Sequence, residues 1–206
     1  MVPAWRRQLL RHQGKTLVEF CRRPKIQERV AGYVVGFSDS LILVHRLDWN
    51  TFLLDGYTIL RDIDIESKRF FTRPSYWQNR AIAKLQLRPQ GLPGLALEDW
   101  PSAIAGIADR FPLLHLESEL TKPDTCYIGV PVKITEKLLI LDNLDSSADW
   151  TGPWTFKLDE ITRLDFGGGY ERALALTAPP RRSKVIKKYG VALKASMLQG
   201  RRSLLG

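Results

Sequence analysis

One pattern of residues occurs twice in this chain of 206 residues, and the repeat constrains the fold more than any other feature. Residues 32–44 recur as residues 129–141, and a constant offset of 97 aligns the two stretches without a gap. The offset matches glycine with glycine at the start, apolar residues along both predicted strands, and Asp39 with Glu136 in the turn. The chain is therefore predicted to contain two copies of one folding unit.

The similarity continues on both sides of this stretch, with one inserted residue near the end of the second copy. A helix is predicted before each copy, within residues 3–12 and within residues 100–111. Asp99 is placed to cap the second helix, and Pro101 suits its first turn. The aligned strand and turn segments are residues 17–20 with 113–116, residues 57–59 with 154–156, and residues 61–63 with 159–161.

The spacing of apolar residues indicates how the strands are buried. Tyr33, Val35 and Phe37 alternate with smaller residues, whereas residues 41–44 are apolar on both faces. A strand buried on both sides that follows a half-buried strand across a short turn is typical of a small closed barrel. The predicted fold class is therefore mainly β with short helices (α+β), in two tandem units that each place a short helix before a five-stranded barrel.

The stretch between the copies reads as a helix and a linker. Pro74 can begin a helix in which Trp77, Ala81 and Leu85 share one face. Residues 89–94, Pro-Gln-Gly-Leu-Pro-Gly, have the composition of a linker. The predicted domains are residues 1–90 with the trailing helix, residues 91–178, and a basic tail of residues 179–206.

This arrangement of a helix and five short strands resembles the Sm-like branch of the SH3-type small barrels. Residues 55–63, Asp-Gly-Tyr-Thr-Ile-Leu-Arg-Asp-Ile, also resemble a segment of bacterial proteins of unassigned activity. In Sm proteins an Asp and a nearby Asn in the turn before the third strand, with an Arg-Gly pair after the fourth, hold a stacked uridine. Asp39 and Arg61 match part of that motif, but Asp62 replaces the glycine, and the second copy has Glu136 and Asp159. The resemblance, over residues 5–71 and 100–170, implies the fold without the base-binding pocket.

The net charge of +9 is concentrated at the two ends of the chain. Residues 1–29 carry +6, residues 30–178 carry −5, and residues 179–206 carry +8. Basic ends of this kind favour contact with phosphate or another acidic surface, although a solvated tail has the same composition. Candidate phosphate-contacting residues are Arg181, Arg182, Lys184, Lys187, Lys188, Arg201 and Arg202 in the tail, which is predicted to be partly helical, and Arg6, Arg7, Arg11, Arg22 and Arg23 near the start.

The inventory of reactive residues predicts neither an enzyme nor a metal or cofactor site. None of the three histidines has metal-ligand spacing to another His or Cys, and His45 is expected to have a structural role at a strand end. Asp62, Asp64 and Glu66 are expected on the solvent side of a strand. Cys21 lies beside two arginines, but no base for it can be located, and Cys21 and Cys126 are both expected as free thiols.

The chain has no apolar run of the roughly 20 residues needed to cross a membrane, and its start lacks a signal-peptide core. A cytoplasmic location is therefore predicted, without membrane association.

Two functions are consistent with these features. The first is a non-enzymatic protein-interaction or assembly module, with a protein partner or a second copy bound at the strand edges of the barrels. The second is RNA binding through the basic ends, with Trp49 and Trp150 as stacking candidates in loops, unless these rings pack on their own barrels. Assembly is favoured because the Sm-type pocket is missing and the middle of the chain is acidic. No small-molecule substrate is indicated.

Overall fold

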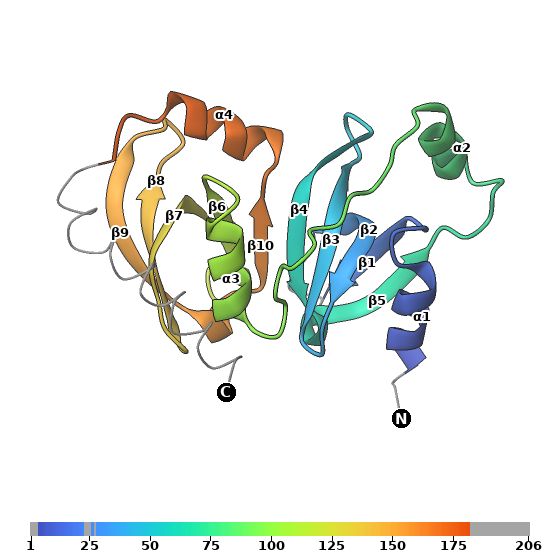
Figure 1. The fold of residues 1–206 in the computed structure, drawn as a ribbon, viewed down its shortest axis with the longest axis horizontal. Coiled ribbons are helices and arrows are strands. Elements are labelled where there is room, and N and C mark those ends of the chain that lie inside the picture. Colours follow the sequence, from blue (N-terminus) through green and yellow to red (C-terminus); the bar gives the residue numbers. More distant parts are fainter. Residues whose placement is uncertain (1–3, 23–25, 27, 182–206) are drawn as a thin grey trace. The chain divides into compact units, whose positions relative to one another are not determined.

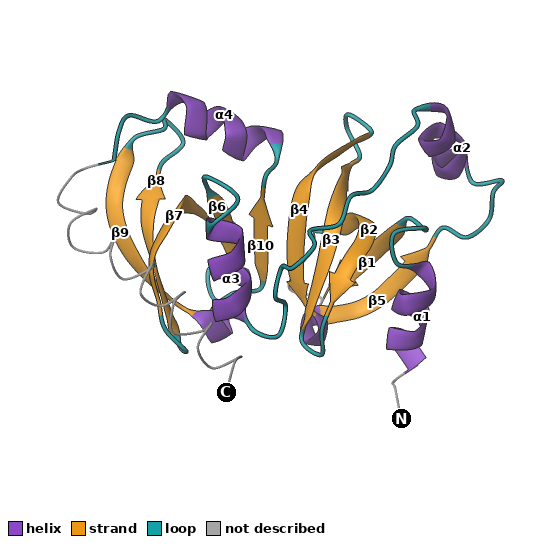
Figure 2. Cartoon of the chain, in the orientation of Figure 1, coloured by secondary structure: helices purple, strands orange, loops and turns teal. Residues whose placement is uncertain are grey.

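The computed structural model describes residues 4–22, 26 and 28–181, and it divides the chain into two compact units, Met1–Glu98 and Asp99–Gly206 (Figure 1). Its described residues form ten antiparallel strands and four short α-helices, which is the predicted α+β class (Figure 2). Residues 91–98, predicted to begin the second domain, belong to the first unit. Leu97 is buried there against Gly36, and the Ser40 hydroxyl donates a hydrogen bond to the Glu98 carbonyl at 3.1 Å.

The first unit places its strands in the order β5-β1-β2-β3-β4, and each neighbouring pair is antiparallel. A single turn of 3-10 helix separates β4 from β5. The elements are α1 (Ala4–His12), β1 (Val18–Arg22), β2 (Val30–Phe37), β3 (Leu41–Asp48), β4 (Leu53–Arg61), η1 (Asp62–Asp64), β5 (Ile65–Phe70) and α2 (Trp77–Lys84).

The second unit repeats this arrangement in the order β10-β6-β7-β8-β9. Its elements are α3 (Trp100–Ala108), β6 (Leu114–Glu117), β7 (Cys126–Ile134), β8 (Leu138–Leu144), β9 (Trp150–Lys157), η2 (Leu158–Glu160), β10 (Arg163–Phe166) and α4 (Gly169–Thr177). The Asp99 side chain accepts a hydrogen bond from the Ser102 amide at 2.8 Å, so the predicted cap of α3 is present. Residues 167–169 are three consecutive glycines, and the last of them begins α4.

The aligned glycines explain why the repeat is so regular. A Cβ atom would lie 2.2 Å from the His45 carbonyl oxygen at Gly32, and 2.1 Å from the Asp142 carbonyl oxygen at Gly129. A bulge follows each glycine, between positions 34 and 36 of β2 and between positions 131 and 133 of β7. A bulge bends its strand, and glycine allows the neighbouring backbone to approach, so both units bend this strand at the same place.

The leading helices contribute to the core of their own unit. Leu9 of α1 is fully buried with strand residues such as Phe20 and Ile42. In the second unit, α3 buries Ala103, Ile104 and Ile107. Such burial contributes about 1.5–3 kcal/mol for each large apolar side chain.

Helix α2 packs on its unit through a face other than that of Trp77. Trp77 and Leu85 share a face as expected, but that face is exposed, with 54% and 52% of the two residues accessible. The helix packs instead through Ile82, with Tyr76 and Leu87 just outside its ends. None of the helices in the described part of the chain is long and apolar enough to span a membrane.

Candidate functional site

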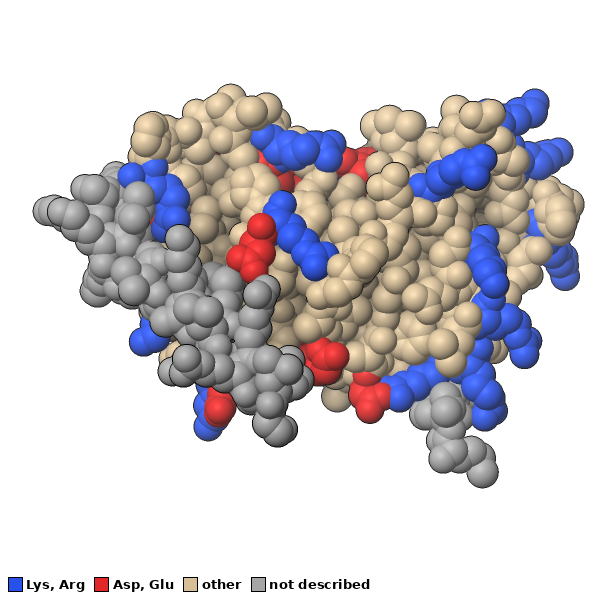
Figure 3. Space-filling view, viewed as in Figure 1, with Lys and Arg blue, Asp and Glu red and all other residues tan. Residues whose placement is uncertain are grey.

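The two units carry opposite charge. The described residues of the first unit include 14 Lys and Arg against 9 Asp and Glu, a net +5. Those of the second unit include 8 against 13, a net −5. The expectation of an acidic middle therefore describes the second unit only, because residues 30–98 of the first unit contain eight Lys and Arg against seven Asp and Glu, and most of that unit's positive charge lies in residues 4–29. Figure 3 shows lysine and arginine side chains gathered over the first unit, at the right of the view.

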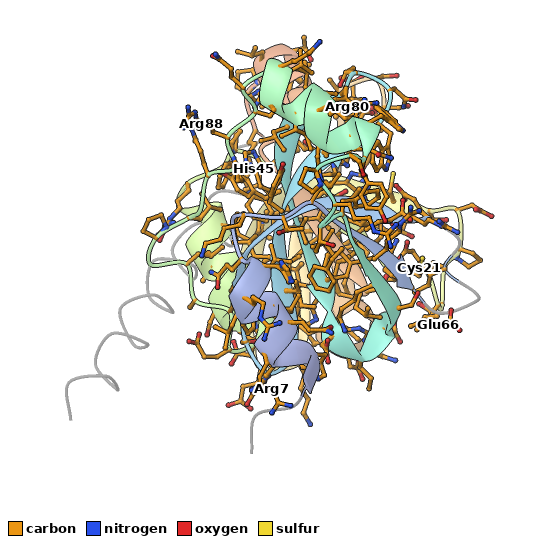
Figure 4. The ribbon with its side chains drawn as sticks, turned by 90° about the vertical axis from the view of Figure 1, so that its right-hand side faces the viewer. Arg7, Cys21, His45, Glu66, Arg80 and Arg88 are labelled. Carbon is orange, nitrogen blue, oxygen red and sulfur yellow. The ribbon has the colours of Figure 1, made fainter. Side chains whose placement is uncertain are left out.

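Much of this basic charge lies on one continuous segment. Residues 67–97, which run from β5 through α2 to the end of the unit, contain six Lys and Arg and no acidic residue. Five of the six are exposed, namely Arg69, Arg73, Arg80, Lys84 and Arg88. In Figure 4, Arg80 and Arg88 lie on the upper part of this unit, and Arg7 lies below them on α1.

An exposed aromatic ring lies within this segment. Trp77 opens α2, and its ring centroid is 5.3 Å from that of Phe52, which in turn contacts Trp49 at 5.9 Å. The Arg69 guanidinium lies 4.8 Å from the centre of the Phe71 ring and 5.9 Å from that of Tyr76. The Trp77 ring therefore packs on Phe52, which in turn packs on Trp49, while about half of the Trp77 residue stays accessible.

The loop that carries Phe52 is held by hydrogen bonds. Asp48 Oδ1 accepts from the amides of Asn50 and Thr51, at 2.7 and 3.1 Å, and the Phe52 amide donates to the Asp48 carbonyl at 2.8 Å. Phe52 has a φ of 55°, a left-handed conformation that is rare for a bulky residue. Such a conformation persists only where its surroundings impose it, as this turn does.

We name Arg69, Arg73, Trp77, Arg80, Lys84 and Arg88 the α2 surface.

The α2 surface contains none of the phosphate-contacting residues predicted from the sequence. Arg7 and Arg11 are exposed on α1, whereas Arg6 forms an ion pair with Asp39. Arg22 is buried and donates to the Glu28 carbonyl at 3.4 Å. Arg181 donates to Asp142 Oδ2 at 3.0 Å in the second unit, with its guanidinium over the Trp150 ring. Six tail residues (Arg182, Lys184, Lys187, Lys188, Arg201 and Arg202), Arg23 and the predicted tail helix lie outside the described residues.

The two tryptophans proposed for stacking pack on their own units. Trp49 is half-buried between Phe52 and Phe71. Trp150 is 9% exposed, and its indole Nε1 donates to the Pro179 carbonyl at 2.7 Å. The Sm-like positions also have internal partners, because Asp39 pairs with Arg6 and Arg61 Nε donates to Asp64 Oδ2 at 2.5 Å.

His45 has a structural environment, but it lies within β3, opposite Tyr33 and Tyr57, rather than at the strand end where it was predicted. Its ring stacks on Tyr57 at 4.6 Å, and Nδ1 accepts a hydrogen bond from the Gln90 amide at 3.0 Å. Burial lowers the pKa of His45, and the nearby Asp55 carboxylate only partly opposes this. The neutral ring therefore ties the segment after α2 to β3.

The second unit contains a cluster of charged side chains that sequence reasoning missed. The register of β6 with β10 sets Glu117 opposite Arg163 and His115 opposite Asp165. His115 Nε2 is 3.3 Å from Glu117 Oε1, and Nδ1 is 3.6 Å from Glu171 Oε1 on α4. Burial alone would lower the pKa of His115, but hydrogen bonds with Cys126, Glu117 and Glu171 and the charge of Asp165 raise it to about 12.

Arg163 rather than a metal ion compensates the carboxylates of this cluster. His115, Glu117 and Asp165 offer ligand atoms within 4.8 Å of one another. However, the Arg163 guanidinium donates to both oxygens of Asp165, at 2.9 and 2.6 Å, and lies 3.6 Å from Glu117 Oε1. A guanidinium in this bidentate arrangement holds the position that a cation would need. The cluster therefore favours an imidazolium and a guanidinium among carboxylates.

No protein-family model matches the chain, no curated protein matches its sequence, and no solved structure matches its fold. Function is therefore inferred from the α2 surface.

Proposed function

We propose that the protein is a non-enzymatic binding module made of two SH3-type, Sm-like barrels, and that its first unit binds single-stranded nucleic acid, RNA in particular. The observation that carries this proposal is the α2 surface, in which two exposed arginines precede an exposed Trp77 in the sequence and three exposed Lys and Arg follow it, with no acidic residue between them. The barrel assignment is supported by the shared strand order, the 3-10 turn before the last strand, and the repeated bulge.

The chemistry of the α2 surface suits a flexible, unpaired strand. Arginine and lysine side chains neutralise phosphates and release counterions, which supplies affinity without reading sequence. An accessible indole offers a stacking face to any unpaired base, worth about 1–3 kcal/mol per base. Because a duplex hides its base faces, the exposed Trp77 favours a single strand over a duplex.

The experiment compares the full chain with a variant in which Arg73, Arg80 and Lys84 are replaced by Glu. Binding to a fluorescently labelled single-stranded RNA of mixed sequence is followed by anisotropy at several salt concentrations. We expect the variant to bind at least tenfold more weakly, and the salt dependence of log K to flatten by about 0.7 for each phosphate that the variant no longer neutralises.

The matched control replaces three exposed lysines of the second unit, Lys133, Lys137 and Lys157, by Glu. The control should bind nearly as well as the unaltered chain. Equal weakening in both variants would show that net charge alone accounts for the effect. Unchanged binding in the variant of Arg73, Arg80 and Lys84 would contradict the proposal. A chain ending at Arg181 tests the tail while keeping the contacts of Pro179 and Arg181 with the second unit.

Assembly with a protein partner is a second candidate, supported by a separate observation. In the described residues β9 has a strand neighbour on one side only, and Trp154 on this strand is 47% exposed. A partner strand could pair with that edge and cover the indole. Sedimentation of the full chain and of Trp154→Ala across a concentration series tests for self-association, and a constant monomer would limit this candidate to a different partner.

A further inference from the structure

The segment that follows α4 is attached to the second unit through a carboxylate and an indole. Arg181 Nε donates to Asp142 Oδ2 at 3.0 Å, and the guanidinium lies 5.8 Å from the centre of the Trp150 ring. The carbonyl of Pro179 accepts a hydrogen bond from the indole Nε1 of Trp150 at 2.7 Å. An ion pair, a cation–π contact and a backbone hydrogen bond thus hold residues 179–181, and neither function proposed above depends on them.

Asp142 lies at a depth where a carboxylate needs a cation. The residue belongs to β8 and is 1% exposed, and its Oδ1 atom has no hydrogen-bond partner among the described residues. Burying a carboxylate is strongly unfavourable unless a positive charge and hydrogen bonds compensate it. The position therefore selects for a cation, which Arg181 supplies in this structure.

The corresponding position of the first unit also receives the segment that follows the last helix of its unit, but by a different chemistry. The repeat offset of 97 aligns His45 with Asp142. His45 Nδ1 accepts a hydrogen bond from the Gln90 amide, a donor that every residue except proline carries. In the second unit the acceptor is a carboxylate and the donor is a guanidinium. The shared attachment point is therefore selective for one kind of side chain only in the second unit.

The chain's own arginine does not use this site fully. Asp142 Oδ1 and Arg181 Nη2 are both buried atoms without a hydrogen-bond partner, although an arginine and a carboxylate form two parallel hydrogen bonds where both can align. Arg181 is restrained because it follows the end of α4, Thr177, by four residues, and because Ala178 packs on the core cluster that contains Trp150. An arginine from another molecule lacks this restraint.

We propose that Asp142 and Trp150 form a recognition site for an arginine-containing segment of a partner protein, and that residues 179–181 occupy the site as an internal competitor. The partner segment presents a backbone carbonyl two residues before its arginine, as Pro179 does before Arg181. The carbonyl accepts from Trp150 Nε1, while the guanidinium lies over the indole and donates two hydrogen bonds to Asp142. The net charge of −5 on the described residues of the second unit attracts such a basic segment.

The first test measures the competition. The peptide acetyl-Ala-Pro-Pro-Arg-amide, which has the sequence of residues 178–181, is titrated into the full chain and into full-length Arg181→Ala. Binding is followed by the nuclear magnetic resonance signal of the Trp150 indole N–H, which is assigned by its absence from Trp150→Phe. We expect roughly tenfold tighter binding to Arg181→Ala, because a tethered competitor acts at an effective concentration of about millimolar. Binding to neither chain, or equal binding to both, would overturn the proposal.

The second test assigns the binding to Asp142. In the Arg181→Ala background, Asp142→Asn keeps the shape of the side chain and removes its charge, so the peptide should bind roughly tenfold more weakly. The matched control is Glu136→Gln, which removes one exposed negative charge from the same unit and should leave the affinity unchanged. Equal weakening in both variants would show that net charge attracts the peptide, and would contradict a site at Asp142. Thermal denaturation establishes that each variant is folded, and Arg181→Gln replaces Arg181→Ala as the background if the latter is not.

The third test varies the ligand. Replacing the arginine of the peptide by lysine should weaken binding several-fold, because an ammonium group cannot form the two parallel hydrogen bonds. Argininamide, which lacks the preceding carbonyl, should bind more weakly than the peptide. Equal affinity of the lysine peptide would contradict recognition of arginine, and equal affinity of argininamide would contradict recognition of a peptide.

Discussion

The two units share an order of elements but differ in nearly everything that lies on their surfaces. Gly32 and Gly129, and the bulge that follows each, occupy corresponding positions. The described residues of one unit nevertheless carry +5 and those of the other −5. A few backbone requirements are therefore enough to maintain this fold while charge and exposed aromatic residues diverge.

The turn between the third and fourth strands of each unit shows the same contrast. Asp48 and Asp145 both accept hydrogen bonds from backbone amides of their turns. The left-handed residue is Phe52 in the first unit, where its ring meets the exposed Trp77, and Ala148 in the second, where it is buried in the core. In the first unit the turn places an aromatic ring against an exposed tryptophan, and in the second it places a small residue in the core.

The largest expected effect tests what the units share. Gly32→Ala and Gly129→Ala each place a Cβ atom about 2 Å from a carbonyl oxygen of the neighbouring strand. Each should lower the free energy of unfolding by about 3 kcal/mol or more, as measured by urea denaturation with circular dichroism. Gly14→Ala, with no atom within 4 Å of the added carbon but a φ of 65°, should cost about 1 kcal/mol. A small loss of stability in Gly32→Ala or Gly129→Ala would mean that the close approach of the neighbouring strand is not the reason both units need glycine there.

The next effect tests the difference in exposed aromatic residues. Trp77→Ala should weaken binding of single-stranded RNA by about 2 kcal/mol, or roughly thirtyfold, because it removes the stacking face. Trp77→Phe should retain most of the affinity. Trp154→Ala, which removes an indole of similar exposure from the acidic unit, should leave RNA binding unchanged. Anisotropy titrations at one salt concentration compare the three variants.

Two histidines should give the units opposite dependence on pH. The folded pKa of His115 is raised, so its stabilising contribution is complete below about pH 6.5 and declines toward pH 12, by at most about 1.4 kcal/mol per pH unit. The folded pKa of His45 is lowered, so its contribution is present above about pH 6.5 and is lost as the pH falls through the folded value.

Thermal denaturation of Cys126→Ser between pH 7 and 9 isolates the His115 effect, because the lowered pKa of the thiol would act in the opposite direction. The melting temperature should fall across this range, and its dependence on pH should be weaker when His115→Gln is added. A flat profile with His115 present would contradict a protonated imidazole in the cluster.

The smallest effect sharpens the comparison of the turns. Asp48→Ala and Asp145→Ala each remove a side chain that accepts two amide hydrogen bonds, and each should cost about 1–2 kcal/mol of stability. Only Asp48→Ala should also alter RNA affinity, since only that turn positions Phe52 beneath Trp77. If both variants bind RNA equally well, the support of Trp77 by this turn is not needed for binding.

Much of the fold could be predicted because it follows from local residues. The repeat located the strands, and Asp99 and Pro101 located the start of α3. Helix α4 was missed because three glycines favour a turn. The helix is also short, and it is stabilised by tertiary packing through Leu174 in the core rather than by its own sequence.

The candidate sites were harder to predict. Helical spacing placed Trp77 and Leu85 on one face, but it does not show whether another element covers that face. The acid-free residues 67–97 were a usable signal, hidden by counting charge across both units. The His115 cluster combines residues from four elements through strand register, which the positions of single residues along the chain do not reveal.

The hydrogen bond between the Gln90 amide and His45 also makes one proton of the backbone a natural probe. Because only the neutral ring can accept that hydrogen bond, the exchange rate of the Gln90 amide with deuterated water follows the ionisation of a single side chain. The amide should be protected above the folded pKa of His45 and should exchange faster below it. Nuclear magnetic resonance of the full chain would then follow the attachment of residues 88–98 without any introduced probe.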